Sequence, residues 1–142
     1  MTNAIFNLPA SYNEPVLTYA PGSPERSRLK AELDRQYGLE VDIPLIIGGQ
    51  EVRTGKLRKV VCPHDHGHVL GHYHEAGEAE IQMAIEAALH AKREWEAMPW
   101  EERAAIFHKI ASLISSKYRY ILNAATMLNQ SKNAHQAEID ST

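Results

Sequence analysis

The segment 100–129 constrains the fold most, because it predicts a long helix with two adjacent apolar rows. Its apolar residues recur in alternating steps of three and four, which places them on one helical face. The first row is Phe107, Ala111, Ile114, Tyr118, Ile121, Ala125 and Leu128, and the second is Ile106, Ile110, Leu113, Tyr120, Ala124 and Met127. A monomeric surface helix does not need so wide a stripe. We therefore expect cover on more than one side, and the remaining sequence supplies only part of it.

Length and composition limit the class of protein. A chain of 142 residues has the size of one domain, and 44% hydrophobic with 23% charged residues are ordinary globular values. The net charge of -3 provides no basic field for a phosphate backbone, so nucleic acid is not expected as a partner. No window is apolar over the length that a bilayer requires, so we expect no membrane span.

The single cysteine and the first residues bear on the compartment. Cys62 is the one cysteine, which excludes an intramolecular disulfide and fits a reducing compartment. The segment 1–12 has no basic leader, no long apolar run and no arginine. These features indicate a cytoplasmic start, or the start of a processed chain.

The amino-terminal part predicts an extended arm followed by a short helix. Three of the seven prolines fall in 1–22, which favours an extended arm there. A disordered tail and an arm laid over another part of a larger protein both remain open. Ser23 as N-cap and Pro24 at the first helical position predict a helix over 24–37, which Gly38 closes.

The middle of the chain changes to the pattern of strands. Short β-branched runs alternate with glycine-containing turns between residues 43 and 74, beginning with Leu45-Ile46-Ile47 and Gly48-Gly49. We expect a small antiparallel β-unit over 43–74.

Three further helical segments follow the β-unit. The pattern predicts amphipathic helices over 78–97 and 101–128, separated by Pro99, with Asn129 as the left-handed stop. Residues 134–142 predict the start of a further helix that carries no stop signal, as an incomplete domain would. The expected fold class is therefore α/β and helix-dominated, with a small antiparallel β-unit plus amphipathic helices.

Histidines are concentrated in one short segment, which holds five of the eight: His64, His66, His68, His72 and His74. Alternate strand residues point the same way, so His64, His66 and His68, or His72 and His74, could face one metal ion. The segment contains no CxxC pair and no HExxH helix. We therefore expect no metal site and favour solvated loop histidines, with a site at His64, His66 and His68 as the alternative.

Cys62 is not expected to be a nucleophile. A catalytic thiol needs a positioned base and an electropositive setting, and Pro63 limits how Cys62 could turn toward the histidines. We expect a half-buried strand residue.

Several segments together resemble the aldehyde dehydrogenase superfamily. They are Ile-Gly-Gly-Gln-Glu-Val at 47–52, Ala-Ile-Glu-Ala-Ala-Leu-x-Ala-x-x-x-Trp at 84–95 and Glu-Arg-Ala at 102–104. Within it, residues 13–16, 22–26, 63–68, 130–132 and 136–140 are similar to the proline-catabolic branch. The resemblance runs from about Asn13 to the last residue. It implies the amino-terminal portion of an aldehyde dehydrogenase-like NAD-binding domain.

The resemblance also implies a reaction. Enzymes of this branch use NAD to oxidise L-glutamate γ-semialdehyde, the open form of pyrroline-5-carboxylate, to glutamate. A cysteine thiolate attacks the aldehyde, hydride passes to the nicotinamide, and a glutamate-activated water releases the product. Their catalytic residues and dinucleotide turn lie beyond the position matching Thr142. The resemblance therefore implies no catalytic or cofactor-binding residue in this chain and no activity of the chain alone.

Glu138 is the one site residue that the resemblance transfers, as a substrate-binding residue on the helix that borders the substrate entrance. A solvated helix carboxylate is the alternative. Two departures are Asn129, where the family usually has glycine, and the triplet Asn133-Ala134-His135, which is less apolar than the family's. Eukaryotic relatives work in the mitochondrial matrix, which is the alternative location if the chain is eukaryotic.

Two other hypotheses remain open. One is a stand-alone histidine-rich metal-binding or helical interaction protein, and the other is a truncated paralogue that accompanies a full-length enzyme. The expected partners are the remainder of the dehydrogenase, or further copies of the chain held through exposed apolar helix faces.

Overall fold

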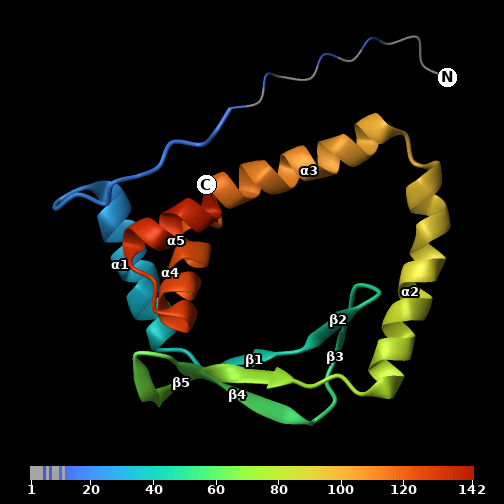
Figure 1. The fold of residues 1–142 in the computed structure, drawn as a ribbon, viewed down its shortest axis with the longest axis horizontal. Helices are drawn as coiled ribbons and strands as arrows, with labels where there is room; N and C mark the ends of the chain where they lie inside the picture. The colour runs from blue at the N-terminus through green and yellow to red at the C-terminus, as the bar shows by residue number, and fades with distance from the viewer. Residues whose placement is uncertain (1–4, 6, 8–9, 11) are drawn as a thin grey trace.

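The fold is mixed α/β, with more residues in helices than in strands (Figure 1). The computed structural model describes residues 5, 7, 10 and 12–142. In chain order the elements are α1 (Pro24–Tyr37), β1 (Val41–Ile43), β2 (Leu45–Ile47), β3 (Gln50–Val52), β4 (Leu57–Cys62), β5 (Asp65–His74), α2 (Glu78–Ala97), α3 (Trp100–Ser115), α4 (Arg119–Gln130) and α5 (Ala134–Ser141). In the described part of the chain, no helix combines the length and apolarity of a membrane span.

The helix α1 has the bounds predicted for it, because its signals are local. The Ser23 side chain accepts a hydrogen bond from the Arg26 N–H at 3.3 Å, and Pro24 occupies the first turn. At the other end, the Gly38 N–H donates to the Asp34 carbonyl at 3.2 Å. The helix α2 also has its predicted bounds, 78–97.

The predicted antiparallel β-unit over 43–74 is incomplete, because β1 begins two residues earlier and pairs in parallel with β5. The strand order in this three-stranded sheet is β1-β5-β4, and β4 pairs with β5 in antiparallel fashion. A separate antiparallel hairpin joins β2 and β3 through Gly48 and Gly49, both at positive φ. Parallel pairing joins strands that are distant in sequence, so no local sequence pattern indicated β1.

The predicted continuous helix over 101–128 is wrong, because α3 ends at Ser115 and α4 begins at Arg119. The Tyr118 N–H donates to the Leu113 carbonyl, five residues back, at 2.9 Å. The Ser116 hydroxyl donates to the Ser112 carbonyl, and such side-chain bonds compete with the helical ladder. The break redirects α4 so that it packs against α1 and α5 (Figure 1).

The predicted stop at Asn129 is also displaced. The helix α4 continues to Gln130, and the left-handed residue is Ser131, with φ of 54°. The next helix, α5, begins where predicted, because Asn133 and Gln136 form a reciprocal capping box.

The core lies between α1, α4 and the described part of the arm. Tyr19, Leu29 and Ala124 form its buried cluster, and partly buried residues pack around them: Leu17, Leu33, Tyr120, Met127 and Ala134. The arm predicted over 1–22 lies partly outside the described residues. Its described end, residues 15–19, is laid over the helices, so that part is not a free tail.

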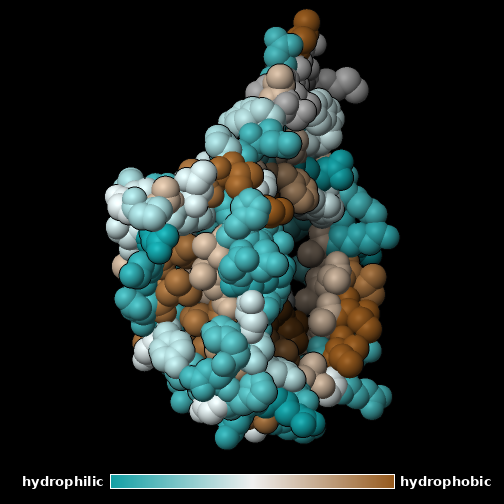
Figure 2. All heavy atoms as spheres, turned by 60° about the vertical axis from the view of Figure 1, so that its left-hand side comes forward, coloured by the Kyte–Doolittle hydropathy of each residue, from teal (hydrophilic) through white to brown (hydrophobic). Residues whose placement is uncertain are grey.

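The helices α2 and α3 are largely uncovered. They form two sides of an open frame whose other sides are the sheet and the α1, α4 and α5 group (Figure 1). Neither helix contains a buried residue, and Leu89 and Phe107 are both 62% exposed. Figure 2 shows apolar side chains open at the surface beside hollows. The cover that the wide stripe requires is therefore missing along α3.

Candidate functional site

Glu138 is the centre of the candidate site, because its side chain is charged and 0% exposed. The backbone N–H of Leu17 donates to its Oε1 at 2.8 Å. The Tyr19 hydroxyl donates to its Oε2 at 2.6 Å, and the Asn123 amide donates to the same oxygen at 2.8 Å. The Arg119 guanidinium donates to both oxygens. A buried carboxylate with this many donors is fully satisfied.

Three parts of the chain supply this cluster. Arg119 and Asn123 lie one turn apart on α4, Glu138 lies on α5, and Tyr19 comes from the arm. Arg119 also donates to the Pro15 carbonyl at 2.6 Å, so its side chain joins the arm to α5. Tyr19 has φ of 52°, a left-handed conformation that is costly for a bulky residue and persists because its surroundings hold it. The cluster therefore fastens residues 15–19 to α4 and α5.

The protonation states of the cluster are set by burial and hydrogen bonds. Burial alone would raise the pKa of Glu138, but the hydrogen bonds from Arg119, Tyr19, Leu17 and Asn123 outweigh it and hold this pKa below its usual value. Burial raises the pKa of Tyr19, and its hydrogen bond to Glu138 and the carboxylate charge raise it further. The stable state is an ionised Glu138 beside a neutral Tyr19.

This arrangement predicts how pH affects the attachment of the arm. The Glu138 contribution to stability is present above its unfolded pKa of about 4.3 and is lost as pH falls further. The Tyr19 hydroxyl contribution is present below about pH 10 and is lost as pH rises beyond it, because the pKa of Tyr19 is raised. Urea unfolding of the chain and of Tyr19→Phe should therefore give free energies that differ at pH 7 and converge above pH 10. A constant difference would contradict the assignment.

The structure decides one alternative for Glu138. A solvated helix carboxylate is wrong, since the side chain has no exposed surface. The predicted apolar rows leave out Arg119 and Asn123, because both residues are polar. Both side chains are nevertheless buried, at 6% and 0% exposure. Their four-residue spacing was a signal that could have been noticed. Nothing local indicated that their partner would be Glu138.

The histidines predicted as possible metal ligands do not converge. His64 contacts the Cys62 sulfur at 3.2 Å through Nε2 and the Ser131 hydroxyl at 2.9 Å through Nδ1. His68 stacks on Tyr37, with ring centroids 3.8 Å apart, and His66 is exposed on β5. Among the described residues, no three His, Cys, Asp or Glu side chains are placed to hold a metal ion. His64 and His68 therefore serve separate contacts.

Two expectations for Cys62 were wrong. Pro63 does not keep Cys62 from the histidines, since the His64 ring lies within hydrogen-bond distance of its sulfur. Cys62 is also fully buried, at 0% exposure, rather than half-buried. The thiol has a neighbouring base but no open face for a substrate, so this pair does not amount to a catalytic nucleophile.

Comparison with known proteins gives a consistent result. The family model described as "Aldehyde dehydrogenase family" matches residues 51–142. A delta-1-pyrroline-5-carboxylate dehydrogenase of Agaricus bisporus is 54% identical over 138 residues, which are 96% of this chain and 25% of that protein. The human mitochondrial protein of the same name is 41% identical over 128 residues, 90% of this chain and 23% of that protein.

A solved structure has nearly the same fold. The delta-pyrroline-5-carboxylate dehydrogenase of Mycobacterium tuberculosis bound with NAD and cobalamin superposes with a TM-score of 0.95 at 44% identity. The match covers 99% of this chain and 26% of that one. The chain thus spans about a quarter of the length of the curated relatives it matches.

Proposed function

Because the chain belongs to the aldehyde dehydrogenase family, we propose that it forms the amino-terminal part of an NAD-dependent dehydrogenase that oxidises pyrroline-5-carboxylate, as glutamate semialdehyde, to glutamate. The observation that carries this proposal is similarity over nearly the whole chain, in sequence and in fold, to proteins named for that activity. The reaction would place this enzyme in proline catabolism. The chain itself would contribute scaffold.

The uncovered helices support a role within a larger assembly. On α2 and α3, apolar side chains are open to solvent along both helices: Ile81, Met83, Ile85, Leu89, Trp95, Ile106, Phe107 and Ile110. Contiguous apolar surface of this kind marks an interaction site. We propose that the remainder of a dehydrogenase covers it, with self-association of the chain as the alternative.

The N-terminal ends of α2, α3 and α5 are poorly suited to bind NAD. A pyrophosphate binds where free backbone N–H groups meet at a helix N-terminus. At α2 the Gly77 N–H already donates to the Glu80 carboxylate at 2.7 Å, and at α5 the Asn133 side chain accepts from the Gln136 N–H at 2.9 Å. Glu101 and Glu102 place negative charge at the start of α3. We therefore assign NAD binding to the remainder of the enzyme.

Glu138 is proposed to act on the substrate side of the complete enzyme. Both of its oxygens accept hydrogen bonds from the chain itself, which favours positioning of the arm and α5 over direct contact with a substrate. Direct contact would require residues 15–19 to lift from the carboxylate. Cross-linking of a substrate analogue to Glu138 in a full-length relative would reveal such contact.

The chain alone is expected to be inactive. With NAD and glutamate semialdehyde, it should produce no NADH above background, because its one cysteine is fully buried. A full-length relative provides the positive control. Addition of the complementary segment of that relative, which follows the position matching Thr142, should restore turnover if the α2 and α3 faces are its docking surface. Turnover by the chain without that segment would contradict the proposal.

The metal-binding alternative is less well supported. Both ring nitrogens of His64 are engaged, by Cys62 and by Ser131, so a metal ion could bind His64 only if one of these contacts broke. Calorimetry with zinc should therefore show only weak binding. Stoichiometric tight binding that is lost on His66→Ala would favour the alternative instead.

The location follows the same proposal. The relatives of Dictyostelium discoideum and of human carry the word mitochondrial in their names. We propose the cytoplasm for this chain, or the mitochondrial matrix if it is a eukaryotic member.

A further inference from the structure

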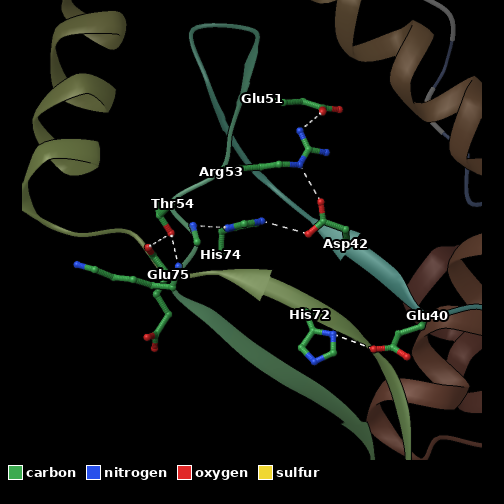
Figure 3. A network of polar contacts seen from close by, with 10 residues as sticks. Glu40, Asp42, Glu51, Arg53, Thr54, His72, His74 and Glu75 are labelled. Atoms are coloured by element: carbon green, nitrogen blue, oxygen red, sulfur yellow. Dashed lines mark hydrogen bonds and ion pairs between the residues drawn. The ribbon is translucent and has the colours of Figure 1, made fainter.

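His74 joins three segments at the point where β5 ends (Figure 3). Its side chain is 6% exposed. The Gly55 N–H donates to its Nδ1 at 3.1 Å, so Nδ1 must be unprotonated. The proton of the neutral ring is therefore on Nε2, which donates to the Asp42 Oδ1 on β1 at 3.1 Å. One imidazole thus bonds both the turn at 54–56 and the strand β1.

Further bonds tie the same turn to the residue after β5. The Thr54 hydroxyl donates to the Glu75 carbonyl at 3.0 Å, and the Glu75 N–H donates to the Lys56 carbonyl at 2.8 Å. Glu75 lies in the short connection that leads into α2. The helix α2 has no buried residue of its own and contacts β2. The hydrogen bonds between this turn and residues 74–75 therefore help to set where α2 begins relative to the sheet.

The charged groups around His74 oppose one another. Asp42 places a negative charge beside the ring, but the Arg53 guanidinium already donates to Asp42 at 2.7 Å and to Glu51 at 2.8 Å. From the other side, Glu75 is paired with Arg58 at 2.8 Å, and Lys56 belongs to the turn itself. Protonation would turn Nδ1 into a donor that faces the Gly55 N–H, and two donors cannot share a hydrogen bond.

We propose that His74 is an acid-labile latch, which holds the turn 54–56 against the end of β5 when neutral and releases the Gly55 N–H when protonated. The bond to Asp42 survives protonation, since Nε2 remains a donor. This inference does not depend on the proposed enzymatic function. It concerns the contact between the turn 54–56 and the end of β5, next to the connection that leads into α2.

His72 is a matched control on the same strand. Its Nδ1 pairs with the Glu40 carboxylate at 2.9 Å, just before β1, and its ring is 28% exposed. This contact is with a carboxylate, whereas His74 Nδ1 accepts from a backbone amide (Figure 3). Protonation of His72 can only strengthen that contact.

The test is amide hydrogen exchange by NMR on the chain between about pH 8 and pH 5, where imidazoles titrate. Exchange rates are expressed as protection factors, which correct for the intrinsic dependence of amide exchange on pH. Loss of one ordinary hydrogen bond should lower the Gly55 protection factor roughly tenfold toward pH 5. The Leu122 amide, which donates to the Tyr118 carbonyl at 2.9 Å in α4, serves as reference and should not change.

Two variants identify the residue responsible. His74→Asn keeps an acceptor near the position of Nδ1 but does not titrate, so Gly55 protection should become independent of pH. His72→Asn should keep the wild-type pH dependence. The latch is refuted if the pH dependence persists in His74→Asn or disappears in His72→Asn.

A measurement on the unmodified ring covers the case in which His74→Asn does not fold. Imidazole ¹⁵N shifts of wild type should show the Nε2–H tautomer at pH 8, and its conversion to imidazolium should follow the loss of Gly55 protection. Gly55 protection that stays constant while His74 becomes charged would overturn the proposal.

Discussion

Replacement of Glu138 by glutamine is expected to lower the free energy of unfolding by about 3–5 kcal/mol, the usual cost of breaking a buried ion pair. Glutamine retains one acceptor oxygen, but the Arg119 guanidinium loses its counter-charge while its side chain is only 8% exposed. Leu17 and Tyr19 lose part of their attachment at the same time. Urea unfolding at pH 7 measures this change.

A control on the same helix separates this effect from a general effect of losing a carboxylate on α5. Asp140 pairs with Lys132 but has a 44% exposed side chain, so Asp140→Asn should change stability by no more than about 0.5 kcal/mol. The double variant Glu138→Leu with Arg119→Met removes both charges and should be more stable than Glu138→Gln. Equal costs for Glu138→Gln and Asp140→Asn would show that the buried pair contributes nothing special.

Leu29→Ala is expected to cost about 2–5 kcal/mol, because it opens a cavity in the core. Leu29 is 3% exposed and packs in the cluster with Tyr19 and Ala124. The loss should therefore loosen both α1 and the arm. Thermal or urea unfolding gives the magnitude.

The same substitution on α2 is the matched control. Leu89 is 62% exposed, so Leu89→Ala should change the stability of the chain by about 0.5 kcal/mol or less. A cost as large as that of Leu29→Ala would mean that the α2 face is covered. In that case a dependence of unfolding on chain concentration would identify self-association as the cover.

The helices and turns whose ends are set by a few neighbouring residues could be predicted from the sequence. Ser23 and Pro24 begin α1, and Gly48 with Gly49 turns the β2–β3 hairpin, because caps and turns depend on neighbouring backbone groups. The family resemblance was likewise carried by short segments in order. The prediction that the chain holds no complete catalytic set rests on the same resemblance and stays a prediction.

Of the candidate site, the sequence alone indicated only Glu138. Its burial depends on Arg119 and Asn123 from α4 and on Tyr19 from the arm, groups 15 to 119 positions away along the chain. Polar residues at buried positions contradict an apolar pattern, so the pattern could not find them. The Cys62 contact with His64 was missed for a different reason, since the restriction on Pro63 φ does not limit the His64 side chain.

The sequence by itself determined the helix-dominated α/β class, the bounds of α1 and α2 and the family to which the segments belong, because these depend on local periodicity, capping and residue order. Only the tertiary structure decided three other features. It broke the helix after Ser115, paired β1 with β5 in parallel, and enclosed Glu138 beneath the arm. The pairing and the enclosure join segments that are not neighbours in the chain, and the break places α4 against the distant helix α1. The bonds of Ser116 and Tyr118 that accompany the break are themselves local.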